Sequence, residues 1–120
     1  MKKAIVILVL LMSVQLSSSA QDVKTVSLEQ TNGDFTQKAL TLSAGNYQFE
    51  ITNNGVDHKV GFVLAQKGKT DAAHHLKNAY VIETVAKNTT GSTNLVTLTK
   101  GDYVYFCPLN PTPQYVLTVE

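Results

Sequence analysis

Hydrophobic and polar residues alternate with a period of two along most of the chain after residue 20. The apolar positions form seven short runs, at residues 26–28, 40–42, 47–51, 60–64, 95–98, 103–105 and 116–119. Runs rich in β-branched and aromatic residues suit the pleated, half-buried face of a sheet. Turn sequences separate them, at Asn32-Gly33, Ala44-Gly45-Asn46, Asn53-Asn54-Gly55, Asn88–Gly91 and Lys100-Gly101-Asp102. The pattern predicts an all-β sandwich or barrel.

One segment departs from the alternation, between residues 67 and 78. Its sequence from Asp71 to Lys77 predicts a turn or two of helix, with Thr70 as the candidate cap. His74 and His75 lie in this excursion. Neighbouring residues of a helix point about 100° apart, so the two imidazoles do not chelate one ion together. We expect both histidines to face solvent.

The N-terminus predicts export. Lys2 and Lys3 precede an apolar run from Ala4 to Met12, and the small residues at 18–20 suit a signal peptidase. The run is shorter than the roughly 20 residues that a transmembrane helix needs. Residues 1–20 are therefore predicted to be a signal peptide, and residues 21–120 one exported domain, periplasmic or secreted, with no stable membrane insertion. An uncleaved, anchoring leader is the alternative.

Charge excludes some partners. Two of the ten basic residues lie in the predicted leader, which leaves eight against nine acidic ones. A nearly neutral domain gives no indication of binding to nucleic acid or to an anionic membrane surface, and we expect neither partner.

Cys107 is the only cysteine of the chain, so it cannot form an internal disulfide. Four roles remain open for it: an inert buried thiol, half of an intermolecular link, a nucleophile, or a metal ligand. His58 is the second candidate, since it shares the facing parity of Val60, Phe62 and Leu64 and is expected to point inward at the end of a strand. Imidazole and thiolate together suit copper. A lone histidine or cysteine is more often a structural residue.

The order of these segments resembles the cupredoxins, the group of plastocyanin, amicyanin and pseudoazurin. In that family the first copper histidine follows an Asn-rich turn, as His58 does, and the copper cysteine ends the penultimate strand, as Cys107 does after "GDYVYF". The resemblance covers almost the whole mature chain. It implies a Greek-key β-sandwich with one short helical excursion, and a copper site at one end.

The same resemblance leaves the type 1 ligand set incomplete. Asn110 stands three residues after Cys107, where the amicyanin-like motif has its second histidine, and Pro113 stands at the methionine position. An amide is a hard, weak donor toward copper, and proline has no donor. Gln114 is a weaker candidate for the axial ligand because its register is off by one, and Tyr115 is expected to begin the last strand and pack.

Two functions follow from these residues. In the first, His58 and Cys107 bind copper, as Cu(I), in copper handling or electron transfer with a redox or copper-delivery protein. In the second, the copper site is lost and the fold serves as an interaction module, with the proline-rich loop at residues 108–113 as its docking surface. A catalytic thiolate–imidazole pair would need a third residue to orient the imidazole, and the sequence indicates none. The protein is therefore predicted not to be an enzyme.

Overall fold

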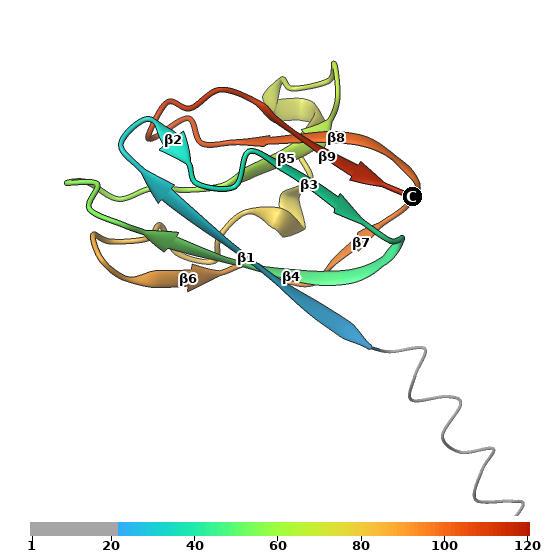
Figure 1. Cartoon of the computed structure of the whole chain (residues 1–120), viewed down its shortest axis with the longest axis horizontal. Coiled ribbons are helices and arrows are strands. Elements are labelled where there is room, and N and C mark those ends of the chain that lie inside the picture. The colour runs from blue at the N-terminus through green and yellow to red at the C-terminus, as the bar shows by residue number, and fades with distance from the viewer. Residues whose placement is uncertain (1–21) are drawn as a thin grey trace, which may run out of the picture.

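Two β-sheets stack face to face in the computed structural model, which describes residues 22–120 (Figure 1). In the first sheet β2 (Asp34–Phe35) pairs with β1 (Val23–Thr31), β1 pairs with β4 (Gly45–Asn53), and β4 also pairs with β6 (Thr90–Ser92) and β7 (Val96–Leu98). The second sheet has the order β3 (Ala39–Leu42), β9 (Tyr115–Val119), β8 (Gly101–Phe106) and β5 (Val63–Gln66). The all-β sandwich predicted from the alternation is confirmed.

The core lies between the sheets and is built from aromatic rings. Along β4 every second residue is buried, from Tyr47 to Asn53. Phe49 packs against Phe62 with ring centroids 5.3 Å apart, and Phe35 meets Tyr105 edge to face at 5.2 Å. Burying an aromatic or aliphatic side chain of this size contributes roughly 1.5–3 kcal/mol.

The run at residues 60–64 is not one alternating strand. Residues 60–65 are all buried, and β5 begins only at Val63. Neighbouring residues of this segment are covered from both sides, by the first sheet and by the excursion that follows, so a period of two does not describe it. The alternation that includes Phe62 and Leu64 therefore does not determine which way the His58 side chain points.

The helical excursion is shorter than predicted. Two 3₁₀ turns, η1 (Ala72–His74) and η2 (Lys77–Ala79), replace the expected α-helical turns. Asp71, not Thr70, occupies the N-cap position of η1, and it makes no side-chain capping bond. The chain leaves the helical conformation at His75 because this residue bridges to Ala65 of β5. Tertiary pairing with the sheet edge limits η1 to three residues.

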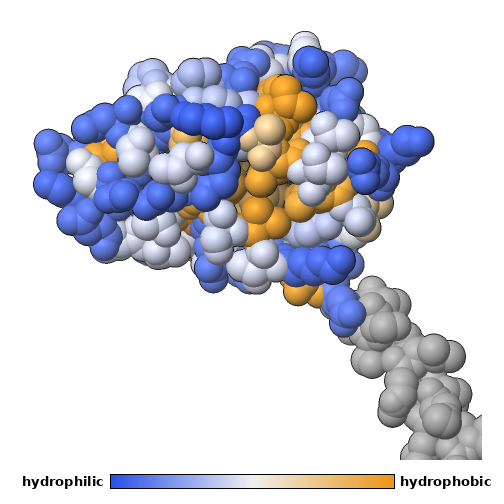
Figure 2. Space-filling model, in the orientation of Figure 1, coloured by the Kyte–Doolittle hydropathy of each residue, from blue (hydrophilic) through white to orange (hydrophobic). Residues whose placement is uncertain are grey.

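On the face shown in Figure 2, which β1, β3 and β9 cross, hydrophobic residues form a stripe. These strands carry half-buried Val26, Leu40 and Leu42, and Val116, which is 36% exposed. Within residues 22–120 no helix is long and apolar enough to cross a bilayer. The predicted signal peptide lies outside the described residues and stays a prediction.

A polar cluster fastens β2 to the start of β9. The Asp34 carboxylate accepts a hydrogen bond from the Tyr115 hydroxyl and forms an ion pair with Lys38, whose ammonium also lies 5.2 Å from the Tyr115 ring centroid. The hydrogen bond from Lys38, followed by that from Tyr115, lowers the pKa of Asp34 below its ordinary value of 3.8. Tyr115 begins the last strand and packs against Phe35 and Tyr105, as predicted from the sequence.

We expect Asp34→Asn to lower the melting temperature by a few degrees at most at pH 7, because the cluster is solvent-exposed and such pairs contribute little. A lowered pKa in the folded state means that the carboxylate stabilises the fold above pH 3.8 and that this contribution is lost as pH falls through the folded-state pKa. The gap between wild type and variant should therefore close on acidification. Thermal unfolding followed by circular dichroism from pH 7 to pH 2.5 measures it, and a constant gap would contradict the assignment.

Candidate functional site at the Cys107 pole

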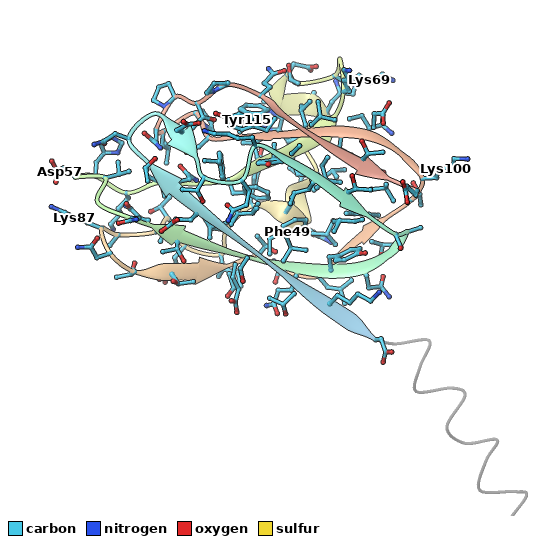
Figure 3. The ribbon with its side chains drawn as sticks, in the orientation of Figure 1. Phe49, Asp57, Lys69, Lys87, Lys100 and Tyr115 are labelled. Atoms are coloured by element: carbon cyan, nitrogen blue, oxygen red, sulfur yellow. The ribbon has the colours of Figure 1, made fainter. Side chains whose placement is uncertain are left out.

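One end of the sandwich gathers the loops that carry the candidate residues. Figure 3 places Asp57 and Lys87 at the tip of this end, and Lys100 at the opposite end. The segment at residues 54–61, the end of β1 with its turn to β2, and the loop at residues 107–114 converge there. Asn54 bonds to Glu29, Gly61 to Cys107, and Gly33 to Asn110. We call this end the Cys107 pole.

Cys107 follows β8 directly, and its side chain is 1% exposed. Its sulfur accepts two backbone hydrogen bonds, from the N–H groups of Gly61 and Asn110, both at 3.3 Å. Sulfur is a weak acceptor, so these bonds orient the side chain more than they stabilise it. The thiol is thus buried and fixed between two segments.

Asn110 is 3% exposed, and its amide is fully used inside the protein. Its Nδ2 donates to Gln30 Oε1 at 3.0 Å and to the Thr31 carbonyl at 2.9 Å, while its Oδ1 accepts the Gly33 N–H at 2.7 Å. Gly33 has a φ of +70°, which glycine adopts without strain, so the turn can aim this N–H at Asn110. Asn110 therefore ties the loop at residues 107–114 to β1.

Gln30 closes the connection. Its side chain is fully buried, and its Nε2 donates to the Gly61 carbonyl at 2.6 Å. Cys107, Gly61, Gln30 and Asn110 therefore form a closed circuit of hydrogen bonds, which we call the pole ring. Within the described part of the chain no buried side-chain nitrogen or oxygen lacks a partner. A fully satisfied buried network of this kind is rigid and specific.

The loop after Cys107 is held in one conformation. The Cys107 N–H donates to Thr112 Oγ1 at 3.1 Å, and the Thr112 N–H donates back to the Cys107 carbonyl at 3.3 Å. Three prolines, at positions 108, 111 and 113, fix further backbone angles. The loop therefore has little conformational freedom left to lose.

His58 does not point inward, which corrects the expectation from the sequence. It is exposed in a bend of the 54–58 turn, with Nδ1 3.1 Å from the Lys59 carbonyl. Buried Asn53 holds this turn by donating to the His58 carbonyl at 3.0 Å. Gly61, three residues further along, is the residue of this segment that contacts the sulfur.

Of the remaining predicted ligands, Asn110 lies beside Cys107, with its backbone nitrogen 3.3 Å from the sulfur. Gln114 is exposed in the loop before β9, and both Asn110 amide groups are bonded to protein. Over residues 22–120 no three His, Cys, Asp or Glu side chains lie close enough together to hold a metal ion. A blue-copper centre requires two imidazoles and a thiolate in one plane. The residues at this pole do not fit that centre.

The two histidines of the excursion behave differently from each other. His74 is exposed and pairs with Asp71 at 2.7 Å, as expected for a solvent-facing residue. His75 is half-buried, contrary to expectation: its Nε2 donates to the Thr70 carbonyl at 2.8 Å, and its Nδ1 lies 2.7 Å from the Tyr80 hydroxyl. A carbonyl only accepts, so Nε2 carries a proton, and both ring nitrogens have partners within the protein. The packing of His75 against Phe106 makes it a structural residue.

Sequence reasoning missed Gln30, although one signal pointed to it. The inward positions of β1 are 26, 28 and 30, and a glutamine at the third of them is polar where the pattern requires an apolar residue. A polar residue at a core position needs a buried partner. No pattern in the sequence names that partner as Asn110, which is 80 positions away.

We expect Asn110→Ala to lower the free energy of unfolding by about 2–4 kcal/mol, because it leaves the Gly33 N–H, Gln30 Oε1 and Thr31 carbonyl without their partner. Asn94→Ala is the matched control, since Asn94 is exposed, and it should change stability by less than about 0.5 kcal/mol. Urea unfolding of both variants gives the two values. Equal, small losses would show that the ring contributes no stability.

Comparison with known proteins places this geometry in a family. The family model for the cupredoxin-like domain matches residues 3–119. Auracyanin A, a "blue" copper protein of Chloroflexus aurantiacus, superposes with a TM-score of 0.67 and 17% identity over 82% of this chain and 100% of its own.

Auracyanin B gives a TM-score of 0.64 with 22% identity over 81% of this chain and 88% of its own. Amicyanin of Paracoccus versutus gives 0.51 with 18% identity over 84% and 88%. Such identities establish the fold alone, and no curated protein matches the chain significantly. The resemblance noted in the sequence is confirmed: this chain belongs to the cupredoxin-like family, with an incomplete type 1 ligand set.

Proposed function

We propose that this protein is a metal-free binding module of cupredoxin fold, in which Cys107 is a packed structural thiol and the loop at residues 108–113 forms the binding face. The pole ring carries this proposal. It uses the sulfur of Cys107 and the amide of Asn110, the two groups that lie where the family's motif has ligands. The module is non-enzymatic and, if the leader at residues 1–20 is cleaved, acts in the periplasm or outside the cell.

The loop has the properties of a binding face. Leu109 is 51% exposed, and its neighbours Pro108 and Pro111 are also exposed. Two hydrogen bonds hold the loop to Cys107: the Thr112 hydroxyl accepts the Cys107 N–H, and the Thr112 N–H donates to the Cys107 carbonyl. A surface that is rigid before binding loses little entropy when a ligand is bound, so more of the contact energy becomes affinity.

Copper binding by His58 and Cys107 is the second candidate. The buried sulfur of Cys107 favours it, because a thiolate is the soft donor that Cu(I) prefers, and His58 lies on the same segment as Gly61, which touches that sulfur. Binding would require the 54–58 turn to release His58 from its Asn53 bond and to swing the imidazole inward. The protein would then handle copper or transfer electrons, with a redox or copper-delivery partner.

Copper titration separates the two candidates. We expect the reduced protein and its Cys107→Ser variant to compete equally weakly with a colorimetric Cu(I) chelator, because the sulfur is enclosed by the pole ring. Native mass spectrometry at one equivalent of Cu(I) should find no bound ion in either. Cys107 should also react with iodoacetamide far more slowly in the folded protein than in urea.

Stoichiometric Cu(I) binding that is lost in Cys107→Ser would overturn the metal-free proposal. Loss of the same binding in His58→Ala, but not in His74→Ala, would then establish the His58–Cys107 pair. His74 is the suitable control because both histidines are exposed.

A further inference from the structure

A pocket of about 330 Å³ opens beside the pole ring. Its floor is the segment from Gly61 to Val63, which is buried, and one wall is Leu109 of the binding loop. Tyr80 and Val81, in the segment between η2 and β6, form the facing wall. Segments that are distant in sequence therefore line one open pocket.

The lining of the pocket is mostly aromatic or aliphatic. No lysine, arginine, aspartate or glutamate of the described chain lines the pocket. Two of the polar side chains in the lining, His75 and Tyr80, are hydrogen-bonded to each other. Both ring nitrogens of His75 therefore already have partners within the protein, and neither is free to bind a ligand. Exposed Thr84 brings a hydroxyl to the pocket lining.

The size of the space sets the size of the ligand. A dry cavity of about 150 Å³ in a protein core binds one benzene, so a pocket of about 330 Å³ holds roughly two fused rings. Ligand pockets are mostly apolar, with a few polar groups that fix orientation. The ring of Tyr80 offers an aromatic contact to a planar ligand, Leu109 offers an aliphatic one, and Thr84 offers one hydrogen bond.

We propose that this pocket binds a small, neutral, two-ring aromatic molecule of about the size of indole, with a hydrogen-bonding group directed at Thr84. The inference rests on the binding role proposed above and names its ligand class. Cys107 does not line the pocket, so the result of the ligand titration does not depend on the result of the copper titration. The pocket is open on one side, and we expect a dissociation constant on the order of 0.1–1 mM for indole itself.

The test is a titration of the isotope-labelled protein with indole, followed by the chemical shifts of its backbone amides. We expect saturable shifts of the amides of Gly61, Val81 and Leu109. Leu109→Asp should weaken binding at least tenfold, because it places a carboxylate in the apolar wall. Leu95→Asp is the matched control: Leu95 is 45% exposed, comparable to Leu109 at 51%, and lies outside this pocket.

Two further arms test shape and charge. A Cβ added at Gly61 would lie 3.6 Å from Leu109 Cδ1, an ordinary contact, so Gly61→Ala should fold normally and weaken binding a few-fold by filling the pocket. At neutral pH, 2-naphthol should bind at least several-fold more tightly than 2-naphthoate, because no lining side chain balances a carboxylate.

The proposal falls if indole causes no saturable shifts, if the shifts lie away from these three segments, or if Leu95→Asp weakens binding as much as Leu109→Asp. It also falls if 2-naphthoate binds better than 2-naphthol. If indole does not bind and no thiol-dependent copper binding is found, only the proposed ligand class is wrong, and the metal-free role stands. Thiol-dependent copper binding removes the metal-free role, whatever indole does.

Discussion

The pole ring is the constraint on which this end of the molecule depends. Its hydrogen bonds join residues that are 31, 46 and 80 positions apart in sequence, so it fixes three segments that the strand ladders alone leave to loops. Closing such long loops has an entropy cost that grows only slowly with length, and a few buried bonds can offset it once the sheets have formed. The ring therefore holds distant segments in fixed positions, as a metal ion does when its ligands come from different parts of a chain.

The sheets of this fold could be predicted because their signal is local and periodic. Tyr47, Phe49 and Ile51 alternate in β4 and are buried as the period of two requires. The same reasoning failed between residues 60 and 65, where both faces of the segment are covered and alternation carries no information. It also failed in the excursion, where His75 pairs with Ala65 and so ends the first 3₁₀ turn. Pairing with a distant strand is not encoded in the local pattern.

The candidate site could be predicted only in part, for the same reason. Cys107 was recognised by its place after an aromatic strand, and it is buried at the pole. His58 was assigned by parity, but Asn53 clamps its turn in an orientation that exposes the ring. The role of Asn110 was read as the absence of a ligand, whereas the folded chain uses its amide in three hydrogen bonds. A side chain that is a poor metal ligand can still form structural hydrogen bonds. Only the three-dimensional positions of its partners reveal that role.

Gly61 links the ring to the pocket. Its N–H and carbonyl belong to the ring, while its open α-carbon side faces Leu109 across the pocket. A ligand in that space therefore rests on backbone that is already fixed from behind, and Leu109 stands on a loop clamped by Thr112. Pre-organised walls do not have to be ordered by the ligand, so a weakly polar molecule can be held by contact area alone. The ring and the pocket therefore share Gly61, and the backbone that lines the pocket is held in place by buried hydrogen bonds.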